Sequence, residues 1–166
     1  DTVIFGDFLV ALGIPILIRG LRRYRQVLRV MLPLVSRFPM RMLYYDTMSG
    51  EADRRFEKYW QESDLIACDF MFLSKTLPDD LTGKTILTNT TTAENIRLLK
   101  DRNVSMVITT TPQYDGRSFG TNLMEAALTA YAGKGRLLTD EELNHIIDEI
   151  GLKPTVHRFT DLPDKV

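Results

Sequence analysis

The sequence predicts an α/β fold built around a mostly parallel β-sheet. Short apolar segments that end in polar residues alternate with segments of helical period, which is the pattern of buried parallel strands joined by helices. Such βαβ units pack their helices against the sheet. The chain has 166 residues, of which 44% are hydrophobic and 26% are charged, so it can bury one core. We expect one domain over residues 1–160, followed by a tail at 161–166.

Five segments are predicted to be strands, and each is short, apolar and followed by polar residues. We expect at least four of them to lie in the parallel sheet. The last segment has the weakest pattern. The five segments are Thr2 to Phe5, Leu65 to Cys68, Thr85 to Thr88, Ser105 to Thr109 and Val156 to Phe159.

Five other segments have a helical period. They are Leu21 to Val35, Ala52 to Gln61, Ala93 to Arg102, Leu123 to Ala132 and Asp140 to Ile150. Thr92 and Thr139 precede two of these helices, where a threonine oxygen can accept a hydrogen bond from a backbone N–H of the first turn. Residues 36–50 have no regular period, and we interpret them as an irregular excursion that forms a lid or a contact surface.

The helix predicted from Leu21 to Val35 is amphipathic and basic. At 100° per residue its apolar side chains share one face, while Arg22, Arg25 and Arg29 group on the opposite side. Two interpretations stay open. The arginines could contact phosphate or a membrane surface, or they could be a solvated face over an apolar stripe that packs on the core. Pro33 is expected to kink the helix or end it.

Composition disfavours several classes of function. The 21 basic and 22 acidic residues give a net charge of -1, so no overall field favours nucleic acid or an anionic membrane. The only cysteine, Cys68, lies in an apolar run, which predicts a buried reduced thiol and a cytoplasmic protein. His145 and His157 have no metal-binding spacing, so no metal is expected.

The start of the chain has no targeting pattern. It reads at once as a strand, without the features of a signal peptide, and we expect a domain that is truncated at its N-terminus. The apolar run at residues 8–18 is broken by Gly13 and Pro15 and is too short to span a membrane.

Polar residues follow successive strands, at the positions where open parallel sheets bind ligands. Because the carboxyl ends of parallel strands share one edge of the sheet, these residues predict one converged site. Asp7 has the setting of the acid that binds a ribose in dinucleotide-binding folds, but it could equally cap the turn that follows it. The candidate cofactor-binding residues are Asp7, Asp69, Asn89, Thr90, Thr91, Thr110 and Thr111.

The loop before the fourth helix predicts an anion cradle. Its glycines, Gly116 and Gly120, bracket Arg117, whose planar donor fork suits a carboxylate or a phosphate. The N–H groups of the following helix also favour an anion. A plain glycine turn with Arg117 in solvent and Asn122 as a helix cap is the alternative. The candidate substrate- or anion-binding residues are Arg117, Ser118, Thr121 and Asn122.

Three stretches resemble a known family. VIFGDFLVALGIPILIRGLRR, TNTTT at 88–92 and GRSFGTN at 116–122 are similar to the C-terminal part of a bacterial Rossmann-like family labelled quinate 5-dehydrogenase-like. The resemblance covers most of the chain. It implies a Rossmann-like three-layer sandwich, NAD or NADP as cofactor, and Asp7 at the second-strand acid position. The lysine and aspartate pair that shikimate and quinate dehydrogenases use has no counterpart in this sequence.

Two functions stay open at this point. The first is an NAD(P)-dependent oxidoreductase acting on a small hydroxy-acid or a related acidic metabolite, whose catalytic residues are unknown. The second is a non-catalytic, regulatory module that binds a nucleotide or a metabolite. A methyl-donor enzyme is a third reading, because Asp7 would suit that ligand too. We expect a small acidic metabolite or a nucleotide as the partner, not nucleic acid or a membrane, and we leave a homo-oligomer open.

Overall fold

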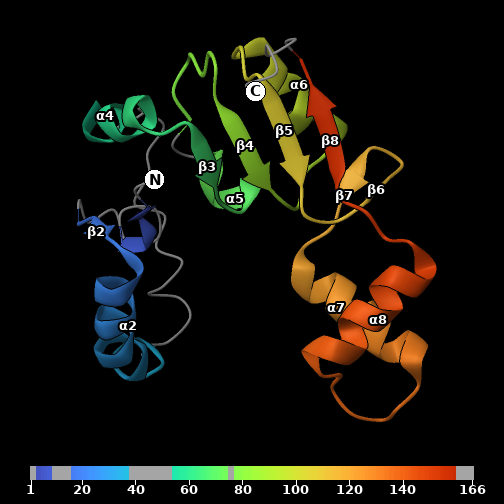
Figure 1. Cartoon of the computed structure of the whole chain (residues 1–166). Coiled ribbons are helices and arrows are strands. Elements are labelled where there is room, and N and C mark those ends of the chain that lie inside the picture. The colour runs from blue at the N-terminus through green and yellow to red at the C-terminus, as the bar shows by residue number, and fades with distance from the viewer. Residues whose placement is uncertain (1–2, 9–15, 38–53, 75–76, 160–166) are drawn as a thin grey trace, which may run out of the picture. The chain divides into compact units, whose positions relative to one another are not determined.

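The computed structural model describes residues 3–8, 16–37, 54–74 and 77–159 (Figure 1). It has a mixed α/β fold, as the sequence predicts, and it divides into two compact units. The first unit is Asp1–Phe56 with Lys75–Leu77, and the second is Glu57–Ser74 with Pro78–Val166. The prediction of one domain with a short tail stays a prediction, because residues 160–166 lie outside the described part of the chain.

The second unit contains a four-stranded sheet that is mostly parallel. Its strands are β3 (Leu65–Ala67), β4 (Thr85–Thr88), β5 (Met106–Thr109) and β8 (Thr155–Arg158), which lie side by side in the order β3-β4-β5-β8 (Figure 1). The first three are parallel to one another, and β8 runs antiparallel to β5. The four segments that form them are among the five that the sequence predicts.

Four of the five predicted strands lie in this mostly parallel sheet, as expected, but only β3, β4 and β5 are parallel to one another. Between β5 and β8 the chain passes through a short hairpin and the helices α7 (Thr121–Ala132) and α8 (Asp140–Ile150). These lead it back to the edge it left, since Thr155, the first residue of β8, pairs with Thr109, the last residue of β5. A strand that starts at that edge must run antiparallel.

The strand nearest the N-terminus is also outside the parallel sheet. It is β1 (Ile4–Phe5), which pairs antiparallel with β2 (Ile18–Arg19) in the first unit. The two strands are close in sequence, so a local antiparallel pair forms without the long crossover that a parallel pair needs.

One face of the four-stranded sheet forms the core of the second unit. Because β3, β4 and β5 lie in sequence order, right-handed crossovers place α5 (Phe70–Leu73) and α6 (Ala93–Asp101) on the same face. Ile86, Val107 and the α6 residue Leu99 are fully buried. On the opposite face Leu87 and Ile108 are only half-buried. The described strands are therefore closed by helices on one face.

Capping boxes begin two of the helices, as the sequence predicts. Thr92 caps α6 together with Asn95, and Thr139 caps α8 together with Glu142. The Glu142 carboxylate also accepts hydrogen bonds from Arg136 and Lys134. These bonds, with that from Arg136 first, hold the pKa of the carboxyl far below its ordinary value. They tie the loop between α7 and α8 to the start of α8.

The first unit contributes the helix α2 (Leu21–Val35), which has the bounds that the sequence predicts. It continues for two residues beyond Pro33, so the proline neither ends it at once nor prevents its last turn. The helix α4 (Arg54–Glu62) follows, and the division between the two units falls within it, after Phe56. The irregular excursion predicted at residues 36–50 lies outside the described residues, apart from Ser36 and Arg37.

Removing the buried end of the Leu99 side chain should destabilise the protein strongly. Leu99→Ala leaves a cavity beneath the sheet, which should lower the free energy of unfolding by about 2–5 kcal/mol. Leu123→Ala on α7 is the matched control, because Leu123 is 55% exposed and should cost well under about 1 kcal/mol. Urea unfolding followed by far-UV circular dichroism measures both. Equal losses in the two variants would contradict this placement of the core.

Candidate functional site

The carboxyl ends of β3, β4 and β5 bring polar residues together at one edge of the sheet. Asp69 comes two residues after β3, Asn89 and Thr90 follow β4, and Thr110 and Thr111 follow β5. The registers of these strands place their last residues side by side. All belong to the second unit. These five residues therefore lie at the same edge of the sheet, and that they form one ligand site stays a prediction.

Thr90 adopts a strained backbone at this edge. Its φ is +55°, in the left-handed region that a β-branched side chain rarely enters. That conformation costs roughly 1–2 kcal/mol. The Thr90 Oγ1 lies 3.2 Å from Oδ2 of Asp69 and 3.0 Å from Oδ1 of Asn89. A hydroxyl has one proton, so Thr90 donates to one of these oxygens and leaves the other available.

The two carboxylate oxygens of Asp69 have different roles. Its Oδ1 accepts a hydrogen bond from the backbone N–H of Met71 at 2.9 Å and so caps the short helix α5. Among the described residues, its Oδ2 has one hydrogen-bond donor, the Thr90 hydroxyl, whose single proton can go to Asn89 instead. Asp69 is half-buried and Thr90 is exposed. The Oδ2 atom can therefore accept a hydrogen bond from a ligand without loss of the cap.

Two other candidate residues, Thr91 and Ser118, are buried and bound to each other. The Ser118 Oγ accepts from the Thr91 N–H at 2.9 Å and lies 2.7 Å from the Thr91 Oγ1. The Ser118 N–H donates back to the Thr91 carbonyl at 2.9 Å. Thr91 is 1% exposed and Ser118 is 4% exposed. Their hydroxyls hold two loops together and do not face a ligand.

Thr110 and Thr111 have different surroundings. The Thr111 hydroxyl is buried and donates to the Phe119 carbonyl at 2.7 Å. Thr110 is exposed, and its N–H donates to the Thr88 carbonyl at 2.9 Å, which extends the pairing of β4 and β5. Of the two, Thr110 alone presents its side chain to solvent.

The loop that contains Arg117 is a β-hairpin, which the sequence reasoning missed. It consists of β6 (Gln113–Tyr114) and β7 (Arg117–Ser118), joined by Asp115 and Gly116. Both turn residues have positive φ, +48° and +75°, as in a type I′ turn. An Asp-Gly pair between short strands is the local signal for this turn, and it was present in the sequence. Arg117 is exposed on the hairpin.

Two glycines seat the hairpin against the site. A Cβ on Gly120 would lie 3.4 Å from the Thr90 Oγ1, and a Cβ on Gly116 would lie 3.3 Å from the Cβ of Ala93. Gly120 is also the N-cap residue of α7. The start of α7 therefore lies beside the strained residue Thr90.

The prediction that Asn122 caps this helix is wrong. The helix α7 begins at Thr121, with Gly120 as its N-cap and no side-chain hydrogen bond to the first turn. Asn122 lies inside the first turn, and both Thr121 and Asn122 are exposed. Glycine can take the cap position at little cost in stability, so the polar residue was not needed there. The first N–H groups of α7 and their partial positive charge remain open to an anion.

Asp7 belongs to the other unit and cannot be placed relative to this edge. It follows β1, which is part of an antiparallel pair, and it has helical backbone. Its carboxylate lies near the Tyr24 hydroxyl. Burial of the phenol, and then the nearby Asp7 carboxylate, raise the pKa of Tyr24. The role of Asp7 as a ribose-binding acid stays a prediction.

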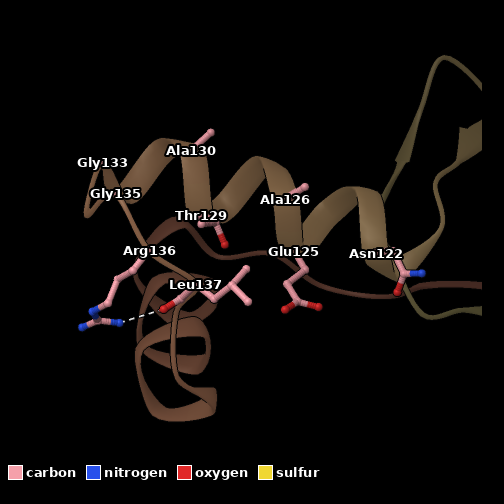
Figure 2. Close-up of a pocket in the computed structure, with 9 residues that line it drawn as sticks. All are labelled: Asn122, Glu125, Ala126, Thr129, Ala130, Gly133, Gly135, Arg136 and Leu137. Atoms are coloured by element: carbon pink, nitrogen blue, oxygen red, sulfur yellow. Dashed lines mark hydrogen bonds between the residues drawn. The ribbon is translucent and has the colours of Figure 1, made fainter.

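A groove of about 780 Å³ runs along α7 (Figure 2). Ala126, Ala130 and Leu137 line it, and Asn122 lies at the end nearest the start of the helix (Figure 2). Arg136 lies at the other end, where it is bound to Glu142. The groove is shallow and largely apolar, with Glu125 and Asn122 among its few polar side chains, whereas polar residues from three neighbouring strands gather at the strand ends. We therefore assign the candidate site to the strand ends.

Comparison with protein families gives one match. The family described as "Domain of unknown function (DUF8754)" matches residues 1–159. The chain belongs to this family. Neither the curated proteins nor the solved structures include a match to it. The family match has no assigned activity, so the resemblance to a quinate 5-dehydrogenase-like family stays a proposal.

Two further observations describe this DUF8754 chain. In the part that the structure describes, no three histidine, cysteine, aspartate or glutamate side chains gather in a way that could hold a metal ion. Among the same residues, no helix has the length and apolar character to cross a membrane.

Substitutions that break the contact between Thr91 and Ser118 should have non-additive effects on the free energy of unfolding. Ser118→Ala leaves the Thr91 N–H and hydroxyl buried without partners, which should cost about 1–3 kcal/mol of unfolding free energy. Thr91→Val should cost less, because Ser118 keeps the backbone hydrogen bond. The double variant should lose at least about 0.5 kcal/mol less than the sum. Ser74→Ala removes an exposed hydroxyl and is the control. Strictly additive losses in a urea-unfolding cycle would contradict the contact.

Proposed function

We propose that the chain is a small-molecule-binding module whose ligand lies over the carboxyl ends of β3 and β4, against the start of α7. The ligand class is a nucleotide or a small acidic metabolite. The observation that carries this proposal is the strained backbone of Thr90, φ +55°, at the centre of the converged polar residues. Strain of this kind gathers at ligand-binding and catalytic sites more than elsewhere in proteins.

The polar groups at this edge match one type of ligand. Asp69 Oδ2 and the Asn89 side-chain oxygen are acceptors for hydroxyl groups, and the Thr90 hydroxyl lies within hydrogen-bond distance of both. The start of α7 supplies backbone N–H donors for a negative group, and its first turn has no acidic residue. A ligand with hydroxyls beside an anionic group fits both sets. A ribose phosphate and a hydroxy-acid each have this arrangement.

Arg117 supports the anionic side of this proposal. It is exposed on β7, one residue before Ser118, which is bound to Thr91. The hairpin is therefore anchored to the same loop that contains Thr90. The guanidinium can add a planar pair of donors for a carboxylate or a phosphate.

An NAD(P)-dependent oxidoreductase is the second candidate function. In a Rossmann-like three-layer sandwich, the acid that binds the ribose hydroxyls follows a parallel strand. Asp69 has that setting, whereas the strand before Asp7 is antiparallel. In this candidate the cofactor would be NAD or NADP, and the substrate would be a hydroxy-acid, as the quinate 5-dehydrogenase-like resemblance implies. No acid and base pair gathers at the edge among the described residues, which favours the binding module.

Replacement of Asp69 should reduce ligand binding in preference to stability. We expect one of NAD, NADP, AMP, malate and quinate to raise the thermal midpoint of the wild-type chain. Asp69→Asn keeps a side-chain oxygen for the α5 cap but removes the charge, and should weaken the affinity by roughly 1–3 kcal/mol.

The matched control for this experiment is Asp80→Asn. Asp80 accepts a backbone bond from Thr82, two residues ahead, and a threonine hydroxyl bond, as Asp69 does. It precedes β4, so it lies at the amino end of the sheet. Asp80→Asn should leave the ligand response unchanged. An equal loss of response in both variants would show that Asp69 acts through the fold alone.

Replacement of Thr90 by glycine should reduce ligand binding while it leaves the free energy of unfolding nearly unchanged. Thr90→Gly removes the left-handed penalty together with one hydrogen bond, so the unfolding free energy should change by less than about 1 kcal/mol. The shift in thermal midpoint caused by the ligand should fall sharply, because the hydroxyl that positions Asp69 and Asn89 is gone.

Asn103→Gly is the control for backbone effects. Asn103 also has positive φ, +62°, but it lies just after α6 and before β5. This variant should retain the full ligand response. A Thr90→Gly chain that binds the ligand like wild type would remove the main support for the proposed site.

A further inference from the structure

The helix α2 is amphipathic, yet it buries none of its side chains. Leu21 is 49% exposed and Leu32 is 57% exposed, although both lie on its apolar face. Most amphipathic helices in proteins gain their stability from packing of that face. The interpretation of the α2 arginines as a solvated face over a packed stripe therefore holds only in part, because the stripe is half-buried at most and exposed at Leu21 and Leu32.

One end of the apolar face has a neighbour within the first unit. Tyr24 stacks on Phe5 with 3.9 Å between ring centroids. The contact fixes α2 to β1 near the helix start. Beyond this contact Leu32 is exposed, while Leu28, Met31 and Val35 are half-buried.

One side of α2 is basic, because Arg22, Arg25 and Arg29 lie within about 60° of one another at 100° per residue, while Arg23 lies apart from them. Arg22, Arg23, Arg25 and Arg29 are all exposed, and no salt bridge or hydrogen bond from their side chains is recorded among the described residues. Residues 16–37 contain six arginines and no acidic residue. The N-cap is Gly20, which offers no side chain, and the first turn has no acid, so the positive end of the helix dipole is uncompensated.

We propose that α2 docks on an anionic lipid surface, lying in the plane of the headgroups. An exposed apolar face bordered by arginines matches the boundary between acyl chains and anionic headgroups. A nucleic acid would satisfy the arginines but would leave the apolar face in water. The expectation of no membrane partner came from the net charge of -1 of the whole chain, whereas the charge of α2 is local.

The helix lies on the bilayer and does not cross it. Its 15 residues span about 22 Å at 1.5 Å per residue, which is less than the roughly 30 Å of the hydrocarbon core. Four arginines within the helix also oppose insertion. The contact is therefore peripheral and sensitive to salt.

Sedimentation with vesicles tests the proposal on the complete chain. The chain should sediment with phosphatidylcholine vesicles that contain 30% phosphatidylserine, stay in solution with pure phosphatidylcholine vesicles, and be released by 0.5 M NaCl. Removal of three arginines, in the variant Arg22→Gln, Arg25→Gln, Arg29→Gln, should lower the partition coefficient on the order of 100-fold, at about fivefold for each arginine.

A charge-matched variant separates the helix from the net charge. Arg97→Gln, Lys100→Gln and Arg158→Gln remove three exposed positive charges from the second unit and should retain binding. For the apolar face, Leu21→Ser with Leu32→Ser should also weaken binding, whereas Leu123→Ser with Leu137→Ser, which are exposed residues near α7, should not. Circular dichroism melts of all variants check that each is folded.

Several outcomes would overturn the proposal. Absence of the wild-type chain from the anionic vesicle pellet at low salt would do so. Equal binding by the α2 variant and the charge-matched variant would do the same, because the arginines of α2 would then have no special role. Binding of a DNA or RNA oligonucleotide together with failure to bind vesicles would identify nucleic acid, not lipid, as the occupant.

Discussion

The candidate site depends on one buried contact, the hydrogen bonds that join Thr91 to Ser118. The two residues are 27 positions apart and belong to the loop after β4 and to the hairpin after β5. Each uses its backbone and its hydroxyl in the contact, and both are almost fully buried. Because the hairpin leads directly into α7, this contact also sets where that helix begins. Together with the hydrogen bond from Thr111 to the Phe119 carbonyl, it fixes the helix terminus relative to the strand ends.

The strain at Thr90 follows from the same contact. Thr88 is held in β4, Thr91 is held by Ser118, and Thr92 must be extended to cap α6. Only Asn89 and Thr90 remain to turn the chain from strand to cap. The left-handed conformation falls on Thr90, although glycine or asparagine would adopt it at lower cost. What the β-branched residue adds is a hydroxyl held between two side-chain oxygens, which favours a role in recognition.

The sequence allowed the local part of this structure to be predicted. The bounds of β4 and α8 agree with the predicted segments. The hydrophobic period and the threonine caps that predict them depend only on residues close together in the sequence. The direction of β8 was not predictable in the same way, since it depends on where α7 and α8 return the chain. The pairing of Thr91 with Ser118 is a contact between distant residues, and nothing local distinguishes a threonine that binds a ligand from one that binds another loop. The Asp115–Gly116 turn, by contrast, had a clear local signal.

The hydrogen bonds at the strand ends show which of the candidate residues can bind a ligand. Among the threonines at the strand ends, those whose hydroxyls are buried, Thr91 and Thr111, complete hydrogen bonds that the fold itself requires. A ligand could reach them only by breaking those bonds, at a cost of about 1–3 kcal/mol for each buried group left unpaired. Thr90 is exposed and has two acceptors for one proton, so a ligand hydroxyl can donate to the oxygen that Thr90 leaves available, without breaking a buried hydrogen bond. Recognition at this edge therefore falls to the residues that the fold leaves incompletely bonded, which are Asp69, Asn89 and Thr90.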